Sequence, residues 1–214
     1  MATFFGKPEI QYKLPDDHGD IAVEEFLHSC SGIVEFVTFL GTAFHPVKSD
    51  IQGNVVKITR VYEKDPSNYT TIKRILDAEA AESGDKIGVA TDALLWLKRA
   101  MEYVCVFLEF FVADHRSGQP SETLVAAGQQ AYDKTLKQHH NMVQRGLFAV
   151  IIHATPWRKD FLQTMAFGRA DAEEECITDL ERYLPSLKAN LNALLDLYYQ
   201  RGLETYDSTV FNVI

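Results

Sequence analysis

The segment from Val89 to Val112 constrains the fold of this chain most strongly. Its apolar residues are spread over more than one narrow stripe of the helix that they would form. A helix of this kind must be covered by neighbours on more than one side. Its longest apolar run, Tyr103 to Ala113, is interrupted by Glu109 and is too short to span a bilayer. The segment therefore predicts a helix sandwiched between other helices.

Apolar residues recur at helical spacing along most of the rest of the chain. The first helix should begin near Asp20, a candidate N-cap, and end at Gly41. Further helices are predicted over residues 72–81, 132–153 and 160–167, then from a cap at Asp171 through Tyr183, and over residues 184–198. Residues 1–19 carry turn-forming Pro, Asp and Gly and are expected to be irregular, whereas residues 20–214 form one domain. The patterns together predict an all-α fold of about eight helices.

Residues 50–61 combine two conflicting signals. Val55, Val56 and other β-branched residues, together with Gly53, favour a strand as readily as a helix. In a helix, Asp50, Asn54 and Lys57 would stack on one face, whereas in a strand Asp50 and Lys57 would point in opposite directions. A stacked carboxylate, carboxamide and ammonium could bind a sugar or an amide, or they could form an ordinary solvated helix face.

The overall charge excludes some classes of partner. The formal net charge is −9 and the sequence pI is about 5.2, which disfavours a nucleic-acid binder and tight adhesion to anionic membranes. The three cysteines are far apart and suit buried core positions, so neither a disulfide framework nor a zinc site is indicated. No secretory signal is evident at the N-terminus, so we expect a cytoplasmic protein.

Two other residues are candidates for a site. Trp96 lies in an apolar helix, where a tryptophan is usually core, although its flat face could also stack on a sugar ring. His140 lies on the apolar stripe of residues 132–153, where a hydrogen-bonded core histidine is the default. An enzyme that pairs Asp50 with His140 as base and acid is possible, but the sequence has no spacing typical of a catalytic triad, a phosphate loop or a metal site.

Four blocks of the sequence, in this order, resemble the glycolipid transfer protein family. They are Phe44-His-Pro-Val-Lys-Ser-Asp-Ile-Gln-Gly-Asn-Val-Val-Lys57, Trp96-Leu-Lys-Arg99, Leu136-Lys-Gln-His-His140 and Ala154-Thr-Pro-Trp-Arg-Lys-Asp-Phe161. The resemblance covers residues 22–205 and implies a two-layer helical sandwich in which residues 50–61 are helical. It also implies a monomer without enzymatic activity or cofactor. Such a protein would carry glycosphingolipids of the glucosylceramide or galactosylceramide type and touch membranes transiently.

The resemblance also implies roles for individual residues. Asp50, Asn54 and Lys57 would bind the sugar and the amide region, Trp96 would stack on the sugar, and His140 would bond the ceramide carbonyl. The lipid chains would occupy a pocket formed by Phe36, Phe44, Val47, Phe107, Leu136, Phe148, Phe161 and Tyr183. Each of these apolar residues could equally be ordinary core.

The sequence departs from the family at three places. Met142 stands where animal members have a tryptophan that enters the membrane, so docking could depend on Trp157, which Arg158 and Lys159 follow. The predicted docking residues are therefore Met142, Trp157 and Arg158. Asp92 replaces an apolar residue one turn before Trp96, where it could change the contacts to a second sugar. The tail after Gly202 does not align securely, and Tyr206 within it could contact the headgroup. The alternative ligand in the same fold is a phosphorylated ceramide, and the alternative role is lipid sensing. A phosphate would favour arginine forks over an aromatic plate.

Overall fold

The computed structural model describes residues 2–84 and 86–205. These residues form eight α-helices: α1 (Val23–Phe39), α2 (His45–Tyr62), α3 (Ile72–Ser83), α4 (Val89–Arg116), α5 (Val125–Lys134), α6 (Met142–His153), α7 (Arg158–Met165) and α8 (Glu173–Gln200). Short 3₁₀ turns, η1 (Pro8–Ile10), η2 (Thr42–Phe44) and η3 (Leu136–His139), lie between them. The all-α prediction is confirmed. Within the described ranges, no helix has the length and apolar character needed to cross a membrane.

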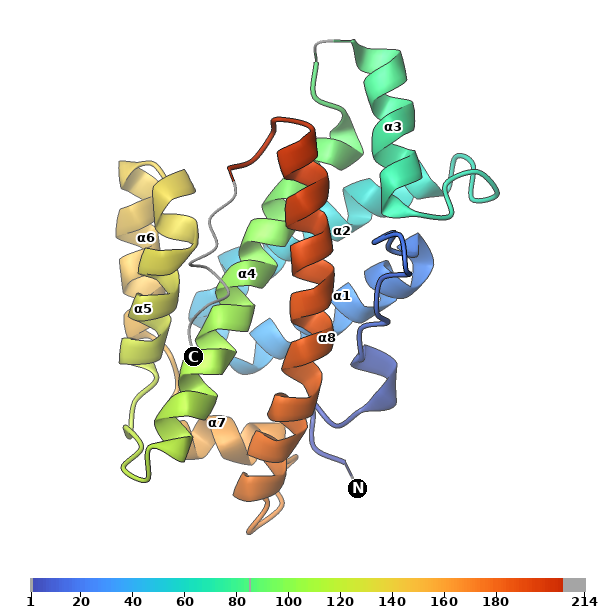
Figure 1. The fold of residues 1–214 in the computed structure, drawn as a ribbon. Helices are drawn as coiled ribbons and strands as arrows, with labels where there is room; N and C mark the ends of the chain where they lie inside the picture. The colour runs from blue at the N-terminus through green and yellow to red at the C-terminus, as the bar shows by residue number, and fades with distance from the viewer. Residues whose placement is uncertain (1, 85, 206–214) are drawn as a thin grey trace.

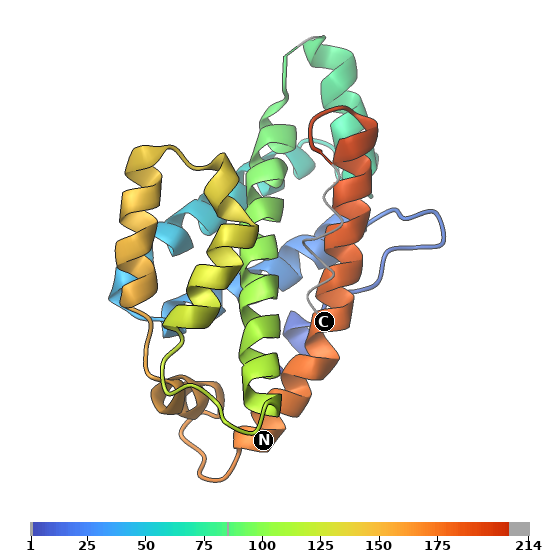
Figure 2. The same cartoon turned by 60° about the vertical axis from the view of Figure 1, so that its left-hand side comes forward.

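Helix α4 is the centre of a two-layer arrangement. It packs against α5 on one side and α8 on the other, and α1 and α2 cross behind it (Figures 1 and 2). Residues 100–109 of α4 are all buried, over nearly three helical turns. A helix buried on every side needs apolar residues on every side, which is the pattern that the sequence shows.

Helix α2 is helical despite its β-branched residues. It packs against both α1 and α4, and it buries Ile51, Asn54, Ile58 and Val61 at helical spacing. Propensity differences of a few tenths of a kcal/mol per residue are small beside the burial of such a face, typically about 1.5–3 kcal/mol for one large apolar side chain. Tertiary packing therefore decides the conformation of this segment.

The described part of the N-terminal segment before α1 forms only the turn η1, but it is part of the core. Phe4 and Phe5 are buried, and the Phe4 backbone N–H donates to the carbonyl oxygen of Met165 at 2.8 Å. A Cβ atom on Gly32 of α1 would stand 2.7 Å from Ile10 Cβ, so the glycine lets this segment lie directly on α1. Residues 2–19 therefore pack as part of the same core.

The predicted single helix over residues 132–153 is wrong. Helix α5 ends at Lys134, the turn η3 follows, and His140 has an extended backbone with φ −95° and ψ 135°. Helix α6 then begins afresh. The Asn141 side chain accepts from the Gln144 N–H at 3.0 Å, and the Gln144 side chain accepts from the Asn141 N–H at 2.9 Å. This capping box places His140 in a corner between two helices rather than on a helical stripe.

Three predicted helix boundaries also differ from the structure. The N-cap of α1 is Ala22 rather than Asp20, and the N-cap of α8 is Ala172 rather than Asp171. The two helices expected between Asp171 and residue 198 are one, because α8 continues through Pro185. An internal proline costs about 3 kcal/mol, but the buried apolar residues on both sides of it hold the helix against α4.

Candidate functional site

The polar face of α2 forms a ladder of three side chains. Asn54 Nδ2 donates to Asp50 Oδ2 at 3.4 Å, and Lys57 Nζ donates to Asn54 Oδ1 at 3.3 Å. Asn54 is only 4% exposed because it lies between the buried Ile51 and Ile58, whereas Asp50 and Lys57 are exposed. The ladder offers an acceptor, a carboxamide and a cation in one row, with its outer members open to a ligand.

His140 and Asp50 lie close enough to influence each other electrostatically. Partial burial raises the pKa of the Asp50 carboxyl, and the charges of Lys57 and His140 oppose this less strongly. The Asp50 side chain still touches solvent, but the protein atoms around its carboxyl remove part of its hydration. Burial likewise lowers the pKa of His140, although the Asp50 charge opposes it. The site therefore favours a neutral imidazole.

Tyr132 orients this imidazole. The Tyr132 Oη lies 3.1 Å from His140 Nδ1, and burial raises the pKa of Tyr132, so the phenol keeps the proton that it can donate. A neutral His140 that accepts at Nδ1 carries its own proton on Nε2. That N–H is then available to a carbonyl oxygen of a ligand. The sequence did not single out Tyr132 for this role, because a single helix through residues 132–153 leaves no corner at His140.

Trp96 stands half-buried on α4, the helix against which α2 packs. The guanidinium carbon of Arg99 lies 5.0 Å from the centroid of the indole, over one face of the ring. Asp92, one turn earlier, is also half-buried. An indole covered on one face by a cation can still receive a sugar on its other face.

A row of aromatic rings runs from His140 into the core. The successive centroid distances, in the order His140, Phe148, Tyr103, Phe107, Phe161, Phe36, Phe5 and Tyr183, are 5.5, 5.1, 6.4, 6.3, 6.0, 5.3 and 4.9 Å. Five of the eight residues predicted to line the chain pocket belong to this row. Phe44 and Leu136 are buried in the same core, and Val47 is partly buried against it. An apolar path thus begins at the ring of His140, in the corner between α5 and α6 that we call the polar corner.

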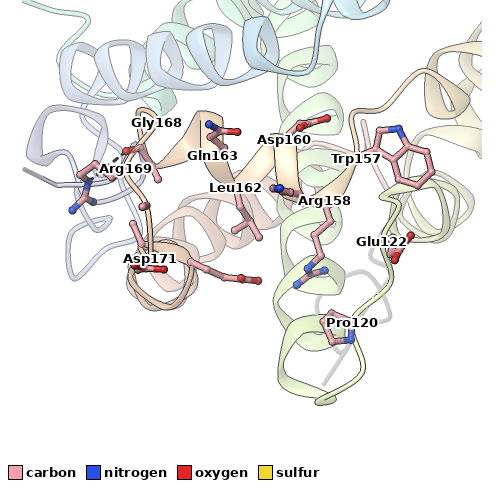
Figure 3. Close-up of a pocket in the computed structure, with 15 residues that line it drawn as sticks. Pro120, Glu122, Trp157, Arg158, Asp160, Leu162, Gln163, Gly168, Arg169 and Asp171 are labelled. Carbon is pink, nitrogen blue, oxygen red and sulfur yellow. Dashed lines mark hydrogen bonds between the residues drawn. The ribbon is translucent and has the colours of Figure 1, made fainter.

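A large cavity lies elsewhere (Figure 3). It has a volume of about 890 Å³ and opens beside α7 and the start of α8, where Trp157 and Arg158 line it. Arg158, which lines this cavity, is bonded to Asp114 of α4. On that helix Asp114 lies about 27 Å from Trp96, at a rise of about 1.5 Å per residue. The cavity walls carry charges of both signs, so the cavity does not suit an apolar lipid chain. These charges are Glu122, Asp160, Asp171 and Glu173 beside Arg158, Lys159 and Arg169.

The three predicted docking residues have different surroundings. Trp157 is 58% exposed and Met142 is 88% exposed, as a membrane contact requires. Arg158 is only 6% exposed, because it donates to Asp114 Oδ2 at 2.8 Å and lies over the Phe111 ring at 4.5 Å. In this arrangement it cannot reach a membrane, so the expectation for Arg158 needs correction.

Helix α6 presents an apolar face to solvent that the sequence pattern did not predict. Met142, Val143, Leu147 and Val150 are exposed on one side of the helix, and Phe148, Ile151 and Ile152 are buried on the other. The apolar stripe predicted over residues 132–153 includes Val143 and Leu147, but the helix that begins at Met142 turns both side chains to solvent. The Asn141 and Gln144 pair was the signal in the sequence that could have shown this break.

Comparison with known proteins identifies the family. The sequence model of the glycolipid transfer protein (GLTP) family matches residues 21–167. The chain belongs to this family. It is 33% identical over 190 residues to the glycolipid transfer protein of Danio rerio, an alignment that covers 87% of this chain and 90% of the relative. It is 35% identical over 215 residues to the human pleckstrin homology domain-containing family A member 8, covering 96% of this chain but 40% of that protein.

Solved structures agree with this assignment. The GLTP fold with which FAPP2 selects simple glycosphingolipids has a TM-score of 0.82 and 34% identity, covering 95% of this chain and 98% of the other. The fungal glycolipid transfer protein HET-C2 has a TM-score of 0.76 and 27% identity, covering 95% and 96%. Human ceramide-1-phosphate transfer protein, in complex with 12:0 ceramide-1-phosphate, has a TM-score of 0.77 at 20% identity, covering 96% of each chain, and shows the fold alone. The GLTP family consists of lipid transfer proteins rather than enzymes.

Proposed function

We propose that this chain binds glycosphingolipids of the glucosylceramide or galactosylceramide type and carries them between membranes without altering them. The observation that carries the proposal is the continuity between the polar and apolar parts of the site. Asp50, the first member of the ladder Asp50–Asn54–Lys57, interacts electrostatically with His140, and His140 lies against Phe148, the first phenylalanine of the row that leads into the core. A glycosphingolipid has the matching order of groups, because its polar sugar–amide head is joined to two apolar hydrocarbon chains.

Each polar group suits one part of the head. Asp50 accepts from sugar hydroxyls, Lys57 donates to sugar oxygens, and Asn54 can do both. Trp96 offers an aromatic plate to the C–H face of the sugar ring. The Nε2 proton of His140 suits the ceramide carbonyl, because Tyr132 occupies Nδ1. No step breaks a covalent bond, so the Asp50 and His140 pair serves recognition rather than acid–base catalysis.

The apolar path explains why a carrier is needed. Moving a hydrocarbon chain into water costs about 0.8 kcal/mol per CH₂, so a chain of about 16 carbons faces on the order of 13 kcal/mol. A slot in the protein that accepts the chain at the membrane surface lowers this barrier. The rings from Phe148 to Tyr183 already touch one another, so entering chains would push them apart. Loading is therefore expected to displace these side chains.

We infer that the exposed apolar face of α6 (Met142, Val143, Leu147 and Val150), together with Trp157, docks on a lipid bilayer. The α6 face begins two residues after His140, and Trp157 precedes by one turn the buried Phe161 of the aromatic row. An indole is favoured at the membrane–water interface, and the exposed Lys159 can reach lipid headgroups. The net charge of −9 makes the apolar contact, rather than overall electrostatic attraction, the source of affinity.

Replacing Trp157 by alanine is therefore expected to weaken binding to phosphatidylcholine vesicles about tenfold, since a partly inserted indole contributes on the order of 1–2 kcal/mol. Sedimentation with vesicles measures this change. Tyr199→Ala on α8 is the control, because Tyr199 is similarly exposed but lies outside the α6 face and α7. Vesicle binding and transfer that are unchanged in Trp157→Ala would show that docking uses another surface.

The proposal is tested by moving fluorescent glucosylceramide from donor to acceptor vesicles, with extraction of the lipid afterwards. A passive carrier equilibrates intact lipid between the vesicles, and neither a chelator nor ATP changes the rate. Binding without movement would indicate a lipid sensor, and a shortened or hydrolysed product would indicate an enzyme. Either outcome would contradict the proposed function.

A further inference from the structure

Next to Trp96, two cations of α4 are neutralised by carboxylates. Lys98 Nζ lies 2.7 Å from Glu102 Oε1 and 3.5 Å from Glu204 Oε2. Arg99 binds Glu204 through two bonds, Nε to Oε2 at 3.0 Å and Nη2 to Oε1 at 3.2 Å. The Lys98 side chain is 2% exposed and that of Glu204 is 8% exposed. These four residues form a buried cluster in which each cation has a carboxylate partner.

The end of α8 fixes the position of Glu204. Gly202 has a positive φ of 67°, and the Leu203 N–H donates to the Tyr198 carbonyl oxygen at 3.0 Å, which is the bond of a Schellman cap. The Tyr198 hydroxyl in turn donates to the Thr91 carbonyl oxygen at 2.7 Å on α4. The chain after α8 is thus directed back onto α4, and Glu204 is held there rather than placed by chance.

The cluster adjoins the candidate site on two sides. The Arg99 guanidinium lies over the Trp96 indole, and His139, the residue before His140, lines a small cavity together with Lys98 and Glu204. Burial and the nearby Arg99 charge lower the pKa of His139 to about 4, so it adds no charge at neutral pH. Burial alone would raise the pKa of Glu204, but the Arg99 hydrogen bond and the charges of Lys98 and Arg99 outweigh it and lower the pKa. Glu204 therefore stays ionised opposite its cations.

We propose that Glu204 determines headgroup specificity: it binds Arg99 and Lys98 beside the Trp96 platform and thereby keeps phosphorylated ceramides out of a site that accepts neutral sugars. This inference rests on the proposed function of the site. Glu204 is a positioning residue, since it acts through Arg99 and needs no contact with the lipid. Its chemical effect is to remove two cations from the reach of an anionic headgroup.

The physical reason is competition for one guanidinium. A phosphate binds arginine through the same paired N–H groups that Glu204 occupies. To bind beside Trp96 in the native protein, a phosphorylated head would have to displace a buried carboxylate and leave it without its partner, which is strongly unfavourable. A neutral sugar makes no such demand. With the carboxylate removed, Arg99 would remain at the indole as a free phosphate ligand.

The test compares Glu204→Gln with the native chain for binding of glucosylceramide and of ceramide-1-phosphate, each presented in phosphatidylcholine vesicles. Glutamine keeps the shape but not the charge. We expect Glu204→Gln to raise the binding of ceramide-1-phosphate relative to glucosylceramide at least tenfold. Glu181→Gln is the matched control. Glu181 makes a similar two-bond pair with Arg116, at 2.8 and 2.9 Å, near the far end of α4, and its loss should leave the ratio unchanged.

A double variant, Arg99→Gln with Glu204→Gln, shows whether the freed Arg99 is responsible. It should bring the ratio back to within about threefold of the native chain, a difference below 1 kcal/mol. Circular dichroism and thermal unfolding of each variant check the fold. An unchanged ratio in folded Glu204→Gln, or a gain that survives in the double variant, would overturn the inference. A native chain that fails to bind glucosylceramide would contradict the proposed function separately, because the effect of Glu204→Gln on ceramide-1-phosphate can still be measured.

Discussion

Asp50→Val should reduce the transfer of glucosylceramide at least a hundredfold. Asp50 is the acceptor of the α2 ladder, and a hydrogen bond to a charged group contributes about 1.5–3 kcal/mol. Loss of two such bonds to sugar hydroxyls would remove on the order of 3 kcal/mol or more, which is a factor of at least about 100. The fold should be retained, because the Asp50 side chain is exposed and its bond to Asn54 is long, at 3.4 Å. Vesicle transfer rates measure the effect, and unfolding curves check the fold.

The control for this variant is Glu63→Val. Glu63 is an exposed carboxylate that caps the C-terminal end of the same helix, outside the ladder. The Glu63→Val substitution removes the same charge and creates the same exposed valine as Asp50→Val. Any general effect of charge or solubility therefore appears in both variants. Transfer by Asp50→Val at the rate of Glu63→Val would mean that the ladder does not bind the headgroup.

Phe161→Ala should lower the free energy of unfolding by about 3–5 kcal/mol, the usual range for a fully buried phenylalanine. Phe161 is 0% exposed and contacts the rings of Phe36, Phe107 and Phe111, with centroid distances of 6.0, 6.3 and 5.0 Å. It is the junction of the aromatic row, so its removal leaves a cavity that three rings cannot fill together. Urea unfolding measures the loss, and the midpoint of thermal unfolding should fall by roughly 6–20 °C for a domain of this size.

Phe167→Ala is the matched control for stability. Phe167 is 42% exposed, and a lysine, Lys7, lies over its ring. Its truncation should cost less than about 1 kcal/mol, because little apolar area is lost. If Phe161→Ala and Phe167→Ala were equally stable, the aromatic row would not be the close-packed core that the ring distances indicate.

The sequence was most informative where one signal dominated. The apolar positions of α4 left no alternative to a covered helix, and α4 lies at the centre of the fold. In α2, local propensity and the pattern of Asp50, Asn54 and Lys57 disagreed. Only burial of Ile51 and Ile58 against the neighbouring helices selects the helical form, and that packing is a tertiary property. The resemblance to the family, rather than propensity, gave the right conformation.

The sequence did not predict the corner at His140, because the apolar periodicity continues across the junction between α5 and α6. Residues from Tyr132 to Ile151 fit one helix, and the cap at Asn141 and Gln144 competes with that pattern only locally. The position of Arg158 was hidden for another reason. Its partner Asp114 is 44 residues away, and a contact of that sequence separation leaves no local pattern. The same limit applies to the pair of Arg99 and Glu204, which joins α4 to the end of α8. The suggested role of Tyr206 falls outside the residues that the structure describes.

The most direct test of a glycosphingolipid carrier is the rate at which the full chain moves two lipids between phosphatidylcholine vesicles. Glucosylceramide and ceramide-1-phosphate with the same acyl chain and the same fluorescent label differ only in the headgroup. We expect rapid transfer of glucosylceramide and transfer of ceramide-1-phosphate at least tenfold slower, a difference of about 1.4 kcal/mol or more. Faster transfer of ceramide-1-phosphate, or no transfer of glucosylceramide above the rate without protein, would contradict the account.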